Sequence, residues 1–62
     1  MRVVNEFYCS SVLQVLGLSV EQANKTAELI AFNPGSEREV LLRNGYSESF
    51  ADSILNELSI GE

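Results

Sequence analysis

The residues of this chain with the capacity for acid–base chemistry are nine carboxylates, with no histidine among them. A catalytic pair of carboxylates needs one shared cleft in which different surroundings separate the two pKa values. Here the acids fall on polar helix faces or at expected helix starts, which indicates a solvated surface. The nine are Glu6, Glu21, Glu28, Glu37, Glu39, Glu48, Asp52, Glu57 and Glu62.

Cys9 is the only cysteine, so no disulfide within the chain is expected. A nucleophilic cysteine needs a base or a positive neighbour that lowers its pKa. The chain has no histidine and no cation near Cys9 in the sequence, so we expect a buried thiol in the core. We expect no zinc site, no cofactor and no enzymatic activity. A lone cysteine suits a reducing compartment, which favours a cytoplasmic protein.

The basic residues are Arg2, Lys25, Arg38 and Arg43, and the formal net charge is −5. Nucleic-acid binding usually requires a basic face, so this balance argues against it, and equally against an anionic membrane surface. No apolar run approaches the ~20 residues of a membrane span. Arg38 and Arg43 flank a short expected helix, where we expect them to form salt bridges between subunits.

Two matching stretches, 12–30 and 40–58, organise the chain. Their glycines, Gly17 and Gly45, lie 28 residues apart (45 − 17). Each stretch reads as a helix, then Gly-hydrophobe-Ser, then another helix. A glycine after a helix takes the left-handed conformation without a Cβ clash, and the next apolar residue packs back on the helix. The pattern therefore predicts two helix-turn-helix hairpins in succession.

The predicted fold is all-α: four short helices in two consecutive hairpins that form a compact small bundle. The first hairpin covers about 5–31 and the second about 36–59, joined by the Phe32–Ser36 turn, in a single domain. Ser19–Gln22 and Ser36–Glu39 both fit a capping box, in which two residues cap a helix start reciprocally. Asn5 and Ser47 are the other expected N-caps.

The first helix has an apolar arc that covers about half of its circumference, which indicates burial on more than one side. Its members are Val4, Tyr8, Cys9, Val12, Leu13, Val15 and Leu16. For the whole domain we expect a core of Leu13, Leu16, Leu18, Ala23, Ala27, Ile30, Val40, Leu41, Tyr46, Phe50, Ile54 and Leu55.

A chain of 62 residues buries a small core and usually needs a disulfide, a metal or a partner. Oligomerisation is the remaining option, so we expect a homodimer. Phe7 and Leu29 lie outside the main apolar faces, and Phe32 is expected to fill the joint between the hairpins. With Arg38 and Arg43 they are the candidate partner-binding residues.

The most economical function is a small acidic protein–protein interaction or regulatory module that binds an unidentified partner protein. Two alternatives remain open. One is a nucleic-acid-associated regulator that uses a helix-turn-helix hairpin, and the other is an acidic inhibitor that mimics DNA.

Leu16-Gly17-Leu18-Ser19, followed by Ala23, resembles the helix-hairpin-helix module. That resemblance implies contact with the DNA backbone through the turn. The module has a second glycine where Ser19 stands here, because its backbone amides approach phosphate.

Asn44-Gly45-Tyr46 with Ala51 resembles the loop and second helix of ubiquitin-associated domains. That resemblance implies a three-helix domain whose loop binds a partner protein, but the chain ends before a third helix in this register. Helix capping alone accounts for both resemblances, and we assign the chain to neither family.

Overall fold

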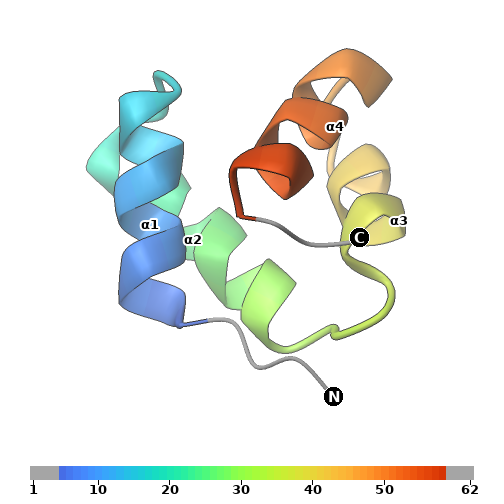
Figure 1. Cartoon of the computed structure of the whole chain (residues 1–62), viewed down its shortest axis with the longest axis horizontal. Coiled ribbons are helices and arrows are strands. Elements are labelled where there is room, and N and C mark those ends of the chain that lie inside the picture. Colours follow the sequence, from blue (N-terminus) through green and yellow to red (C-terminus); the bar gives the residue numbers. More distant parts are fainter. Residues whose placement is uncertain (1–4, 59–62) are drawn as a thin grey trace.

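The computed structural model describes residues 5–58, and this part of the chain is all-helical. The two halves pair their helices side by side, as Figure 1 shows. This arrangement confirms the predicted all-α fold with two hairpins. In chain order the helices are α1 (Glu6–Val15), α2 (Val20–Ala31), α3 (Glu37–Arg43) and α4 (Glu48–Glu57).

The packing of the helices follows the chain. α1 packs mainly on α2, α2 meets α3, α3 packs on α4, and α4 touches α1 lightly. In Figure 1 the α1–α2 hairpin therefore stands on one side and the α3–α4 hairpin on the other. No helix within residues 5–58 is long and apolar enough to cross a membrane.

Both hairpin turns end their first helix by the same backbone geometry. Gly17 has a φ of +112° and Gly45 a φ of +95°, which favour glycine. The amide of Leu18 donates to the carbonyl of Leu13 at 3.1 Å, and Tyr46 makes the equivalent bond at 3.2 Å. These are the bonds of a Schellman motif, so the predicted helix ends are confirmed.

Three of the expected N-caps are confirmed. The side chain of Asn5 accepts from two amides in the first turn of α1. The hydroxyls of Ser19 and Ser47 accept from the amides of Gln22 and Phe50, each at 3.2 Å. These bonds satisfy amides that have no partner within the helix.

The predicted capping box at the start of α3 is wrong. Ser36 has φ −124° and ψ 19°, and its side chain makes no cap bond. Its amide instead donates to the carbonyl of Asn33 at 3.1 Å, across a turn that contains Gly35 at φ +86°. The carboxylate of Glu39 is turned to Arg43, at 2.8 Å. The turn fixes the backbone of Ser36, and the ion pair with Arg43 engages the Glu39 carboxylate that the capping box would require.

The core is close to the predicted one and lies where the four helices meet. Ala51 and Leu58 join it, Cys9 is buried as expected, and Val40 is only half-buried. Five further predicted members are partly buried and pack against the core: Leu16, Leu18, Tyr46, Phe50 and Leu55. The fully buried members include alanines of α2 and α4, which let helices approach closely. The buried apolar residues are Cys9, Leu13, Ala23, Ala27, Ile30, Leu41, Ala51, Ile54 and Leu58.

A polar contact joins the two hairpins beside this core. The hydroxyl of Tyr46 lies 2.7 Å from the hydroxyl of Thr26, a fully buried residue. The side-chain amide of Gln22 donates to the same Tyr46 hydroxyl at 3.1 Å. Gln22 thus bonds across the hairpins rather than back to its predicted capping partner. The ring of Tyr46 also stacks on Phe50, with centroids 5.6 Å apart. The turn of hairpin two is thereby held on α2.

Candidate functional site

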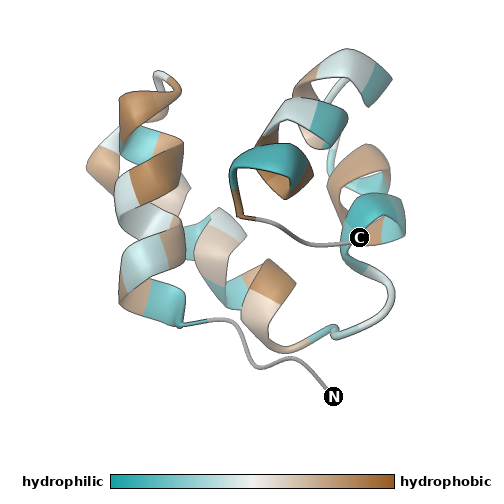
Figure 2. Cartoon of the chain, viewed as in Figure 1, coloured by the Kyte–Doolittle hydropathy of each residue, from teal (hydrophilic) through white to brown (hydrophobic). Residues whose placement is uncertain are grey.

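The outward side of α1 carries large apolar side chains that no other element within residues 5–58 covers. Phe7 is 84% exposed, Tyr8 57% and Val15 87%. Residues four apart on a helix share a side, so Phe7, Ser11 and Val15 form one row with Tyr8 beside it. We call these four residues the α1 face. In Figure 2 apolar colouring is visible along the part of α1 nearest its C-terminal end.

An open groove of about 420 Å³ runs beside the α1 face. It lies between α1 and the end of α4, and half-buried side chains of α1 form part of its wall. The lining residues are Tyr8, Ser11, Val12, Val15, Leu16 and Glu57. The groove and the α1 face together form one continuous, mainly apolar surface.

The exposure of Tyr8 and Val15 contradicts their expected burial. The width of the apolar arc predicted neighbours on two sides of α1, but α2 covers one side and α4 makes only a light contact. One edge of the arc therefore faces solvent. The width of the apolar arc could have indicated this exposed surface from the sequence, because one neighbouring helix cannot cover half of the circumference of α1.

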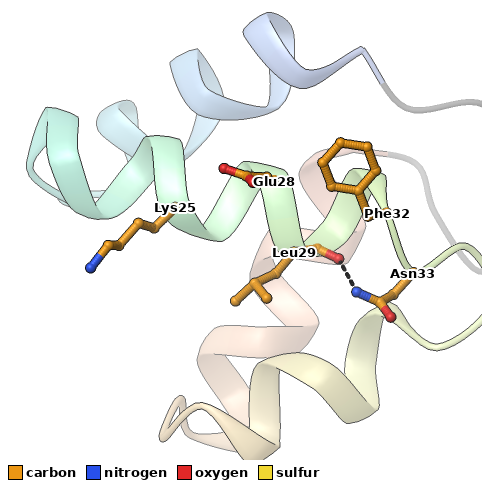
Figure 3. Close-up of a pocket in the computed structure, with 5 residues that line it drawn as sticks. All are labelled: Lys25, Glu28, Leu29, Phe32 and Asn33. Atoms are coloured by element: carbon orange, nitrogen blue, oxygen red, sulfur yellow. Dashed lines mark hydrogen bonds between the residues drawn. The ribbon is translucent and has the colours of Figure 1, made fainter.

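A second groove, of about 360 Å³, lies along α2. Figure 3 shows its residues: Lys25, Glu28, Leu29, Phe32 and Asn33. The side-chain amide of Asn33 donates to the carbonyl of Leu29 at 2.7 Å, which closes the end of the helix. Leu29 and Phe32, two of the predicted partner-binding residues, are thus brought into one groove.

The prediction that Phe32 fills the joint between the hairpins is wrong. It is 71% exposed and occupies the C-cap position of α2. The chain turns immediately after it, through Asn33 and Pro34, so the ring remains outside the packed helices. In Figure 3 the ring of Phe32 and the side chain of Leu29 leave α2 in different directions.

The two candidate arginines of α3 form ion pairs within the chain. Arg38 donates to Asp52 at 2.9 Å and to Glu48 at 3.2 Å. These two hydrogen bonds raise the pKa of the Arg38 guanidinium above its ordinary value. Arg43 donates to Glu39 at 2.8 Å. The expected bridges between subunits are therefore met by internal carboxylates, and a role of these arginines in partner binding stays a prediction.

Cys9 is fully buried, as predicted. Burial, together with the nearby charge of Glu6, raises the pKa of its thiol to about 11. The thiol is therefore protonated at neutral pH and is a poor nucleophile. Among residues 5–58 no three or more histidine, cysteine or acidic side chains gather as a metal site would require.

Sequence reasoning placed Phe7 outside the core correctly but missed Tyr8 and Val15, which complete the surface around it. The structure leaves Phe7 on α1, Leu29 and Phe32 on the groove of α2, and the two arginines on α3. The five candidates thus fall on three separate surfaces. No family model, no curated protein and no solved structure matches the chain.

Proposed function

We propose that this chain is a small acidic protein-interaction or regulatory module that binds another protein through the α1 face and its groove. The observation that supports this most is the exposure of Phe7, Tyr8 and Val15 on one side of a single helix. Contiguous apolar patches on small soluble domains generally mark binding surfaces. The module would act by covering a surface of its partner.

The residue types on the α1 face suit this role. Aromatic side chains are enriched among the residues that contribute most to protein–protein binding. Phe7 and Tyr8 are adjacent on the first turn of α1, where Asn5 caps the helix. The helix therefore presents both rings from a fixed backbone. Truncating such an anchor typically costs about 1–3 kcal/mol of binding free energy.

A double substitution separates binding from folding. Ser11→Glu with Val15→Arg places a Glu–Arg pair, four residues apart, on the α1 face. The chain already carries such a pair in α3, where Glu39 and Arg43 lie 2.8 Å apart. Pairs at this spacing support a helix, so the variant keeps its fold and loses its apolar surface. Circular dichroism checks the fold.

The test is affinity purification from the source cells with three baits, read by mass spectrometry. The baits are the natural chain, the variant Ser11→Glu/Val15→Arg, and the matched control Ser49→Glu/Ser53→Arg, which places the same pair at exposed positions of α4. The expected result is at least one protein that the natural chain and the control retain and the α1 variant loses. Identical retention by all three baits would contradict the proposal.

A further inference from the structure

We infer that the partner of the α1 face is a second copy of this chain, held antiparallel across a two-fold axis at Ser11. This inference rests on the proposed function, because it names the occupant of the same surface. In a two-fold contact the same patch is used on both copies, so the patch must be self-complementary.

Charge is the first argument for a second copy. α1 holds one charged residue, Glu6, among ten, whereas α3 holds four among seven. The whole chain has a net charge of −5, so most contacts between two copies bring acid near acid. The α1 face is a surface of the described residues on which two copies can meet through uncharged side chains.

The spacing along α1 is the second argument. Phe7 and Val15 each lie four residues from Ser11 (11 − 7 and 15 − 11). In an antiparallel pair with its axis at Ser11, Phe7 of one copy therefore lies opposite Val15 of the other. A large ring meets a smaller side chain at both ends, and two small serines meet at the centre. This alternation lets two helices pack closely.

The exposed area sets the strength of the dimer. At their observed exposures, Phe7, Tyr8 and Val15 leave roughly 400 Å² of apolar surface per copy, given the ~150–250 Å² of an aromatic side chain. A standard interface covers ~800 Å² per partner, so the contact is small. We therefore expect a reversible dimer with a dissociation constant of roughly 10–100 µM.

The charge of the chain makes a second copy distinguishable from a basic partner. Each copy carries a net charge of −5, so two copies repel each other when they associate, and salt weakens that repulsion. Added salt therefore tightens this dimer, whereas it would release a basic partner.

Sedimentation equilibrium over ~5 µM to ~1 mM tests the dimer at low and high salt. The natural chain is expected to dimerise, more tightly at high salt. The matched control Ser49→Glu/Ser53→Arg changes the dissociation constant by less than ~2-fold, and Ser11→Glu/Val15→Arg raises it at least ~30-fold. A chain that is monomeric throughout, or an α1 variant that dimerises as well as the natural chain, overturns the inference.

A disulfide trap tests the position of the axis and does not depend on the double variant. Helix axes ~8–10 Å apart bring facing Cα atoms to within ~4–6 Å, which a disulfide can span. Ser11→Cys should therefore give a covalent dimer on mild oxidation. The matched control Glu39→Cys should give little. Equal yields from both variants, or none from Ser11→Cys, overturn the antiparallel arrangement.

The two proposals fail in different ways. A monomeric chain whose α1 variant still loses a captured protein overturns the second copy and leaves the interaction module standing. If the chain does not dimerise and no captured protein depends on the α1 face, both proposals are overturned.

Discussion

The two hairpins use the same turn and present different outer surfaces. Gly17 and Gly45 end α1 and α3 with equivalent bonds, and the next helix of each hairpin has a serine cap. At the same offset of 28 residues, however, Ser11 and Val15 correspond to Glu39 and Arg43 (39 − 11 and 43 − 15). An exposed apolar position thus stands where the other hairpin has an ion pair.

The hairpins also differ in the length of their first helix. α1 has ten residues and α3 has seven, and both end at equivalent positions. The additional residues at the start of α1 include Phe7 and Tyr8, where hairpin two has the turn before α3. The repeated turns thus account for folding, while the part of hairpin one that is not repeated carries the candidate binding surface.

Truncating the apolar residue under each turn should have the largest effect on stability, and it tests whether the two turns are equivalent. Leu13→Ala and Leu41→Ala each remove a fully buried side chain. Each should lower the free energy of unfolding by about 2–5 kcal/mol, because a cavity is left in the core. Urea denaturation at fixed protein concentration measures this. If only one of the two substitutions lowered the free energy of unfolding, the two turns would not be equivalent.

Substituting the turn glycines should have a smaller effect of similar size in both hairpins. Gly17→Ala and Gly45→Ala force a Cβ atom into a positive φ, and no described atom lies within 4 Å of that Cβ. Backbone strain is then the whole cost, about 1–2 kcal/mol in the free energy of unfolding for each. Thermal denaturation of both variants provides the measurement, and an unchanged midpoint would contradict the assigned turns.

Tyr46→Phe examines where the two turns differ, because the equivalent residue in hairpin one is Leu18. The change removes the hydroxyl that meets Thr26 and Gln22, so the buried Thr26 hydroxyl loses its partner. We expect a loss of about 1–2 kcal/mol in the free energy of unfolding. Tyr8→Phe is the control, since that side chain is exposed, and it should leave stability unchanged. Equal stability of both variants would mean that the contact between hairpins contributes nothing.

The ion pairs of hairpin two should have the smallest effect. Arg38→Ala removes contacts to Glu48 and Asp52 that are exposed to solvent. Exposed pairs contribute little, so the midpoint of thermal unfolding should fall by at most ~3 °C. Repeating the measurement in high salt should reduce the difference. A large fall that is independent of salt would show that Arg38 holds the fold through something other than charge.

Local chemistry made most of the fold predictable. Gly17, Ser19 and Ser47 act within a few residues of themselves, so their roles follow from the sequence. Ser36 failed as a cap because a neighbouring turn had already fixed its backbone. The sequence does not show whether the turn or the cap forms, since the residues around Ser36 fit both.

The surface was harder to predict, because exposure depends on how many neighbours a helix has. The apolar pattern of α1 is the same whether one or two helices cover it, so Tyr8 and Val15 could not be separated from Leu13 by pattern alone. The bond from Tyr46 to Thr26 joins residues 20 apart in the sequence, and nothing local specifies it. The partner-binding role of the α1 face stays a prediction for binding experiments.

The caps at both ends of α1 determine the thermodynamic character of any binding there. Asn5 closes the start of the helix and Gly17 its end by bonds within the chain. The helix that carries Phe7 and Tyr8 is thus already ordered before a partner arrives. Association then requires little loss of backbone entropy, which favours affinity from a small area. The far-ultraviolet circular dichroism of the chain should accordingly be the same in its free and bound states.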